Sequence, residues 1–121
     1  MYDLNINRKL LLIAVTLLTP FQLNASNVGF LKYAVITDFT ESDILKLQKE
    51  YTQVLKNNKP GDRHNWFNAE TGNRGEITVI KQYKQKDSIC KRLKLRNQSK
   101  KQSAVSYFNF CSIDNQWKVV N

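Results

Sequence analysis

Two kinds of hydrophobic periodicity divide the chain at Gly61. Residues 40–57 carry apolar side chains at the three- and four-residue spacing of a helix with one buried face. Thr40 is a good N-cap and Asp43 stands three residues later, an arrangement that resembles a capping box, while Pro60 and Gly61 end the segment. The pattern predicts one amphipathic helix. The apolar residues on its predicted buried face are Ile44, Leu47, Tyr51, Val54 and Leu55.

After Gly61 the apolar residues alternate with polar ones, which is typical of strands. The alternating stretches are short and turn-forming residues separate them, so the sequence predicts an antiparallel meander of about four to five strands. In one stretch the alternation places Ile77, Val79 and Tyr83 on the same face. The strand candidates are residues 64–68, 75–83, 87–96, 103–111 and 113–120.

The two cysteines, Cys90 and Cys111, fall in adjacent strand candidates. A hairpin about the turn at residues 97–102 sets them opposite each other and also separates apolar from basic positions, whereas a one-residue slip would mix the two kinds. Because both features agree, we predict a cross-strand disulfide; two free buried thiols are the alternative. The same register pairs Leu93 with Phe108, Leu95 with Ser106, Lys91 with Phe110, Arg92 with Asn109, Lys94 with Tyr107 and Arg96 with Val105, and puts Ile89 on the apolar face.

These elements predict an α+β domain in which the N-terminal helix covers the apolar face of the small antiparallel sheet. A small closed barrel without the helix packed on it is the alternative. Residues 27–37 are apolar on both alternating faces, and periodicity does not decide between a buried strand and the start of a helix.

The first 25 residues have the pattern of a secretory signal peptide. Arg8 and Lys9 precede an apolar run at residues 10–18, and a small residue, Ala25, stands at the expected cut. This run is shorter than the roughly 20 residues that span a bilayer, so we expect an exported mature chain without a transmembrane span; an uncleaved anchor is the alternative. The predicted organisation is a signal peptide (1–25), an N-terminal segment (26–39) and one domain (40–121).

Positive charge is concentrated in one part of the sequence. The chain has 19 basic and 10 acidic residues, a formal net charge of +9 at pH 7, and residues 81–101 hold nine basic residues and one acid, Asp87, a net +8. A local field of this kind attracts anionic partners such as a wall polymer, lipopolysaccharide or nucleic acid. The alternative is a solvated outer face whose charges oppose aggregation. The candidate binding residues are Arg92, Lys94, Arg96, Lys100, Lys101 and Tyr107.

Residues for catalysis are sparse. His64 is the one histidine, and with the nearby Glu70 and Glu76 it could form the acid–base set of a small secreted ribonuclease, although a turn position near the start of the sheet is the favoured interpretation. A metal site needs more ligands than one histidine and two paired cysteines, and the sequence has no phosphate loop or nucleophile elbow. We predict no enzymatic activity, no cofactor and no metal site.

The most distinctive stretch is WFNAETGNRG. In it Trp66 is predicted to anchor the core, Asn68 and Thr71 to bond turn backbone, and Gly72 and Gly75 to permit the turn by positive φ. Later residues continue the pattern: Tyr83, Cys90 followed by a basic residue, Cys111, and Asp114 with Trp117 before KVV. Over about residues 40–120 this pattern resembles the C-terminal domain of the rickettsia-type 17 kDa surface antigen family.

The resemblance implies a small β-rich domain at the cell envelope of a Gram-negative bacterium, and a surface or outer-membrane antigen with no known chemistry. Such proteins usually carry a lipid-attachment cysteine and a glycine-zipper segment before this domain, whereas here the first cysteine is Cys90 and Gly29 stands alone. We therefore predict a non-enzymatic envelope protein, on the outer-membrane surface, periplasmic or secreted, that acts by binding or structural contact with an envelope component or protein partner. The alternative is a secreted or periplasmic binding module or inhibitor whose basic face engages an anionic polymer.

Overall fold

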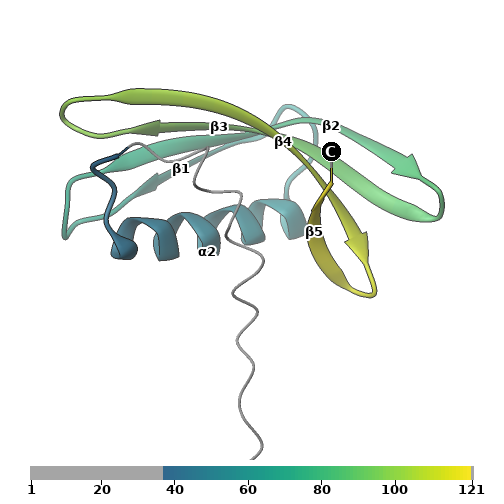
Figure 1. The fold of residues 1–121 in the computed structure, drawn as a ribbon. Coiled ribbons are helices and arrows are strands. Elements are labelled where there is room, and N and C mark those ends of the chain that lie inside the picture. The colour runs from purple at the N-terminus through teal and green to yellow at the C-terminus, as the bar shows by residue number, and fades with distance from the viewer. Residues whose placement is uncertain (1–36, 121) are drawn as a thin grey trace, which may run out of the picture.

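One helix, α2 (Glu41–Asn57), lies against one face of a five-stranded sheet in the computed structural model, which describes residues 37–120 (Figure 1). The strands stand in chain order and each is antiparallel to the next, so the predicted α+β meander is confirmed and the closed barrel is wrong. Residues 1–36, with the predicted signal peptide and most of the N-terminal segment, lie outside the described residues. The strands are β1 (Arg63–Phe67), β2 (Arg74–Gln85), β3 (Ser88–Gln98), β4 (Ser103–Ile113) and β5 (Gln116–Val120).

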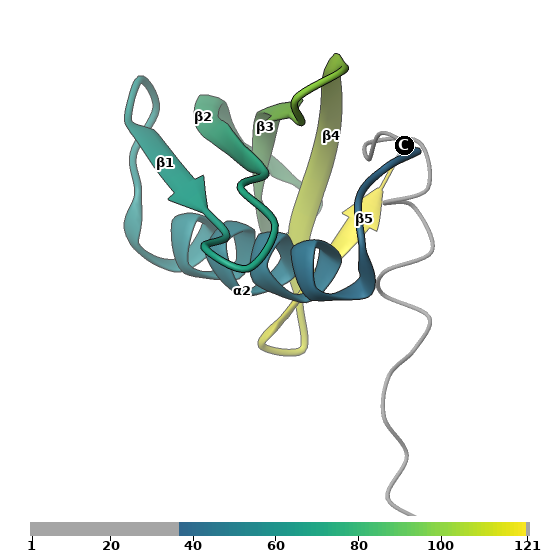
Figure 2. The ribbon, with the colours of Figure 1, turned by 90° about the vertical axis from the view of Figure 1, so that its left-hand side faces the viewer.

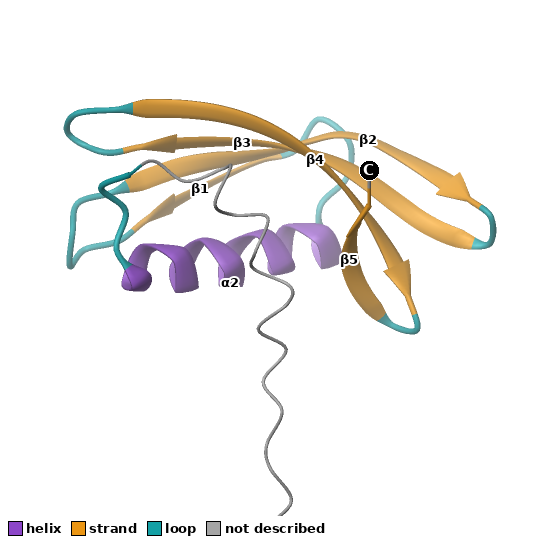
Figure 3. Ribbon diagram, viewed as in Figure 1, coloured by secondary structure: helices purple, strands orange, loops and turns teal. Residues whose placement is uncertain are grey.

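The helix and the sheet form two layers. Figure 2 shows α2 crossing beneath the strands, and Figure 3 shows the same layers by type of element. The core lies between the layers, where apolar side chains of α2 meet those of the strands, and the opposite face of the sheet is covered by no element of residues 37–120. Among these residues, no helix is long and apolar enough to cross a membrane. The buried core residues are Leu47, Tyr51, Val54, Leu55, Trp66, Ile77, Val79, Leu93, Leu95 and Phe110.

The helix begins where the sequence predicts. The hydroxyl of Thr40 accepts a hydrogen bond from the Asp43 amide, and the Asp43 carboxylate accepts one from the Thr40 amide at 2.8 Å, so the capping box is complete. A capping box satisfies two backbone donors that the first turn leaves without intrahelical partners.

The β3–β4 hairpin has the predicted register. Cys90 lies opposite Cys111, the two form a disulfide, and their Cα atoms are 4.0 Å apart. All six further predicted pairs are present, from Lys91 with Phe110 to Arg96 with Val105. Ile89 shares the face of Lys91 and Leu93 as predicted, but it is 44% exposed because the β2–β3 end of the sheet extends past the end of α2 (Figure 1).

A β-bulge changes the face of Tyr83. The pairing of β2 with β3 shifts between Val79 and Lys81, which leaves Ile80 as an extra residue. An extra residue reverses the alternation of the strand beyond it, so Tyr83 pairs with Cys90 and does not share the covered face of Ile77 and Val79 as predicted. Its ring lies 5.1 Å from the Lys81 ammonium group.

Candidate functional site

The side of the sheet opposite α2, here called the outer face, carries the basic strand residues predicted to bind anions. Arg92, Lys94 and Arg96 alternate along β3 with Leu93 and Leu95, which are fully buried against the helix layer. Successive strand residues point to opposite faces, so the three basic side chains project from the outer face. Their alternation with buried leucines is why sequence pattern alone could place them.

The remaining members of the predicted set lie around these three. Tyr107 is opposite Lys94 on β4, and its ring centre is 5.2 Å from the Arg92 guanidinium carbon, within the range of a cation–π contact. Lys100 and Lys101 are exposed in the turn between β3 and β4, at the end of the sheet and apart from the strand residues. The structure therefore joins four of the six predicted residues in one surface and leaves two at its margin.

Other strands add basic residues that sequence reasoning missed. The register places Arg63 of β1, Arg74 and Lys81 of β2, and Lys118 of β5 on the outer face as well. Among the described strands, Glu76 is the acidic residue on this face. These positions are far apart in sequence, so only a full set of strand pairings could have revealed that they share one surface.

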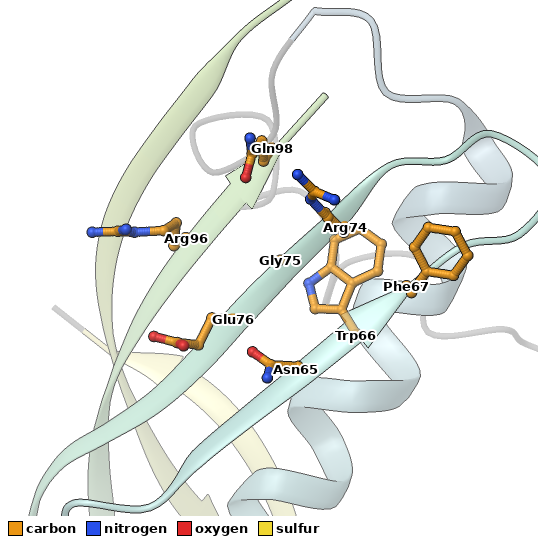
Figure 4. Close-up of a pocket in the computed structure, with 8 residues that line it drawn as sticks. All are labelled: Asn65, Trp66, Phe67, Arg74, Gly75, Glu76, Arg96 and Gln98. Atoms are coloured by element: carbon orange, nitrogen blue, oxygen red, sulfur yellow. The ribbon is translucent and has the colours of Figure 1, made fainter. Parts of the chain in front are cut away.

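A hollow of about 380 Å³ lies on the outer face where β1, β2 and β3 meet. Figure 4 shows its lining, with Asn65, Glu76 and Arg96 in one row across the three strands and their side chains directed to the same side. A second row lies two residues along each strand, and Trp66 and Gly75, between the two rows, also line the hollow. This second row is Phe67, Arg74 and Gln98.

The turn that contains the distinctive stretch binds the start of α2. Asp43 is fully buried, and its carboxylate accepts hydrogen bonds from the Asn68 amide at 2.8 Å, the Thr71 hydroxyl at 2.5 Å and the Asn73 amide at 2.8 Å. As predicted, Asn68 and Thr71 also accept hydrogen bonds from turn backbone, from the amides of Glu70 and Asn73. The bonds to Asp43 were not predicted, because no local pattern links residues so far apart.

These contacts determine the ionisation of Asp43. Burial raises the pKa of its carboxyl, but hydrogen bonds from the side chain of Thr71, the backbone of Thr40 and the side chains of Asn73 and Asn68 outweigh this, so the pKa lies below its ordinary value of 3.8. Asp43 is therefore a buried carboxylate at the positive end of the helix dipole, where negative charge is favoured.

The two glycines of the stretch have different roles. Gly72 has a φ of +78° and provides the predicted left-handed turn residue. Gly75 does not have a positive φ, so that part of the prediction is wrong: it lies in β2 opposite Trp66. A Cβ at Gly75 would collide with the indole nitrogen of Trp66 and with the Arg96 carbonyl oxygen, so the absence of a side chain allows the buried indole to pack across the strand.

A buried cation from the sheet lies at the other end of the helix. The ammonium group of Lys91 donates to the carbonyl oxygens of Leu55 at 2.8 Å and Asn58 at 2.7 Å, and it lies 5.7 Å from the Trp117 ring centre. Burial lowers the pKa of Lys91 below its ordinary 10.5, and the charge of Asp62 opposes this shift. The cation meets helix carbonyls that have no intrahelical partner.

His64 lies in β1 and not in a turn, and its ring nitrogen Nε2 is 2.5 Å from the Glu50 carboxylate of α2. The two glutamates considered with it lie elsewhere: Glu70 accepts from the Ser42 hydroxyl, and Glu76 is on the outer face. The structure does not assemble the considered acid–base set. Within residues 37–120, no group of three or more potential ligands could hold a metal ion.

Glu50 is also held by a second cation, since Lys46 lies 3.0 Å from its other carboxylate oxygen. Burial raises the pKa of Glu50, but hydrogen bonds to His64 and Lys46 outweigh it, so the pKa lies below the ordinary 4.5. This cluster joins the middle of α2 to β1.

A sequence model of the family described as 17 kDa outer membrane surface antigen matches residues 53–118. The chain belongs to this family. The match runs from the second half of α2 into β5 and includes the turn stretch and both cysteines. The description of the family favours an exported protein of the cell envelope. The chain matches no curated protein and no solved structure closely enough to establish a relationship.

In this 17 kDa surface antigen domain, the residues of the turn stretch and the basic residues of the outer face have different roles. Asn68 and Thr71 hold the helix on the sheet through Asp43, and Gly75 makes room for Trp66. Those residues explain how the domain keeps its shape. The strands place several basic residues and one acidic residue, Glu76, on the outer face, which makes it the candidate site of contact.

Proposed function

We propose that this surface antigen domain is a non-enzymatic cell-envelope protein that acts by contact, and that the outer face is its contact surface. The observation that supports this is the placement of basic side chains from β1, β2, β3 and β5 on the face that α2 leaves uncovered.

The chemistry of the face favours an anionic polymer of the envelope as the partner. Several cations on one surface bind such a polymer by replacing its counterions, which makes affinity fall as salt rises. Arginine adds the ability to hold planar anions by two parallel hydrogen bonds. The contact with Tyr107 holds the Arg92 guanidinium close to the sheet and so lowers the entropy lost when it binds.

His64 has a structural role in this proposal. Its contact with Glu50 joins helix and sheet, and the glutamates that an acid–base mechanism would need are placed elsewhere. The domain therefore acts on its partner by binding and not by changing a covalent bond.

The test is binding of the oxidised full-length chain to heparin, a soluble polyanion, at increasing salt. We expect the logarithm of affinity to fall linearly with that of salt concentration, and the triple variant Arg92→Gln, Lys94→Gln, Arg96→Gln to bind about tenfold or more weakly. A variant with the same loss of charge on the helix side, Lys49→Gln, Lys56→Gln, Lys59→Gln, is the control. Equal losses in both variants would contradict the outer face as the site, and no binding at low salt would contradict an anionic partner.

A further inference from the structure

We infer that the hollow at the β1 end of the outer face binds acidic sugar units, so that the partner is a polysaccharide bearing carboxylate groups. This rests on the proposed function and names the partner class that the outer face would recognise. The lining of the hollow, a second hollow beside it and the one acidic residue of the lining support this inference.

The lining combines charge with an exposed ring. Arg74 and Arg96 are diagonal neighbours on β2 and β3, with Cα atoms expected about 7–8 Å apart. Neither takes part in the two ion pairs found among residues 37–120, which are those of Glu50 with Lys46 and with His64. Both guanidinium groups are thus available to a ligand, and a guanidinium holds a carboxylate by two parallel bonds.

Phe67 offers a sugar an aromatic surface, and the side-chain amides of Asn65 and Gln98 offer it hydrogen bonds. Phe67 lies at the end of β1, is 56% exposed and lines the hollow. An aromatic ring can pack against the apolar C–H face of a pyranose, while Asn65, Gln98 and Glu76 offer donors and acceptors for its hydroxyl groups. The volume of about 380 Å³ is within the range of small-ligand sites.

A neighbouring hollow makes room for a second unit. It has a volume of about 300 Å³, shares Arg74 and Gln98 with the first, and extends to Lys100 in the β3–β4 turn. A linear polymer whose first acidic unit lies between Arg96 and Arg74 would therefore place its next unit beside Lys100. This also gives a role to a turn lysine that lies apart from the basic residues of the strands.

Glu76 favours a ligand rich in hydroxyl groups. It lies opposite Arg96, so its carboxylate repels phosphodiesters and sugar carboxylates alike. The free hydroxyl groups of a sugar can donate hydrogen bonds to that carboxylate, whereas a phosphodiester group has no donor. Single-stranded nucleic acid also binds mainly by stacking successive bases on several aromatic rings, whereas the hollow exposes one, Phe67.

The test is a calorimetric and NMR titration of the full-length oxidised chain with the trimer of galacturonic acid. We expect saturable binding with amide shifts centred on β1–β3, no binding of neutral maltotriose, and weaker binding of polyglutamate. Phe67→Ala and Arg74→Gln should each weaken trimer binding by about fivefold or more. Lys49→Gln, at an exposed position of α2 away from the outer face, makes the same change of charge as Arg74→Gln and should weaken it less than about twofold.

The outcomes separate this inference from the proposed function. Suppose that Phe67→Ala has no effect, while Arg92→Gln and Lys94→Gln weaken the binding of the trimer and of polyglutamate equally. The sugar site is then wrong, and the general anion-binding surface stands. Tighter binding of a single-stranded oligonucleotide than of the trimer overturns the sugar assignment in favour of nucleic acid. Absence of binding by every anion at low salt contradicts both. Because Phe67 and Arg74 are exposed, their variants should fold, which unchanged amide spectra away from β1–β3 would verify.

Discussion

The ammonium group of Lys91 lies 2.8 Å from the carbonyl oxygen of Leu55, so a cation of the central strand contacts the last turn of the helix. At the opposite end, the carboxylate of Asp43 is buried in the first turn. Each charge has the sign that the helix dipole favours at its position. The sheet and its turns therefore hold α2 at both ends by buried charges, and apolar packing fills the space between.

Replacing Lys91 by methionine should destabilise the domain by about 2 kcal/mol, because two carbonyl oxygens at the helix end would lose a charged donor. Methionine keeps much of the apolar length, so the loss reports on the hydrogen bonds. The measurement is the free energy of unfolding in urea. Lys118→Met, at an exposed position of β5, is the control and should change it by less than about 0.5 kcal/mol. Equal effects would mean that Lys91 does not stabilise the helix end.

Replacing Asp43 by alanine should cost about 3 kcal/mol or more. The change removes a capping box and leaves the side chains of Asn68, Thr71 and Asn73 without the acceptor they share in a buried place. Thermal and urea unfolding would measure the loss. Glu41→Ala, also an acid in the first turn but exposed, should cost well under half as much. A small effect at Asp43 would show that the turn keeps its shape without this anchor.

Stability should fall in acid because of Asp43 and Glu50. The pKa of each carboxyl is lower in the folded chain than its ordinary value, 3.8 for Asp43 and 4.5 for Glu50. Between the folded and the ordinary pKa the unfolded chain binds more protons, so acidification favours unfolding. The stabilisation is complete above the ordinary values and is lost as pH falls through the folded-state values. Urea midpoints from neutral pH to below pH 3.8 would show this; Glu50→Gln should flatten the upper part of the fall, and Glu41→Gln should not.

Replacing Gly75 by alanine should destabilise by about 3 kcal/mol, because its Cβ would lie 2.5 Å from the Arg96 carbonyl oxygen and against the buried indole of Trp66. Gly72→Ala meets no neighbouring atom and should cost only the strain of its positive φ, about 1 kcal/mol. Unfolding free energies of the two variants, with tryptophan fluorescence to follow the indole, would compare them. A larger cost at Gly72 would contradict packing as the reason for Gly75.

The regular elements could be predicted because their signals are local or repeat with a fixed period. The helix of residues 40–57 was evident from apolar spacing and from its cap. The register of the β3–β4 hairpin followed from two cysteines and an alternation that only one pairing satisfies. These features depend on residues that are close in sequence or linked through one short turn.

The rest depends on contacts that no short pattern records. A bulge at Ile80 puts Tyr83 on the opposite face from the one predicted, and the alternating pattern of that strand does not indicate an extra residue. Lys91 was expected opposite Phe110, which is right, but its hydrogen bonds to the end of α2 require the packed layers. The hollow likewise exists only once β1, β2 and β3 lie side by side, since Asn65, Glu76 and Arg96 are separated along the chain.

The disulfide between Cys90 and Cys111 links two residues that already pair across adjacent strands, 21 positions apart. A hairpin slipped by one residue would turn one thiol to the opposite side of the sheet and would bury arginine and lysine where leucine belongs. The covalent bond can therefore close only on the correct alignment, and once closed it prevents the strands from sliding. In an oxidising compartment the bond would therefore close on one alignment of β3 and β4, the one that directs the charged side of the hairpin to solvent.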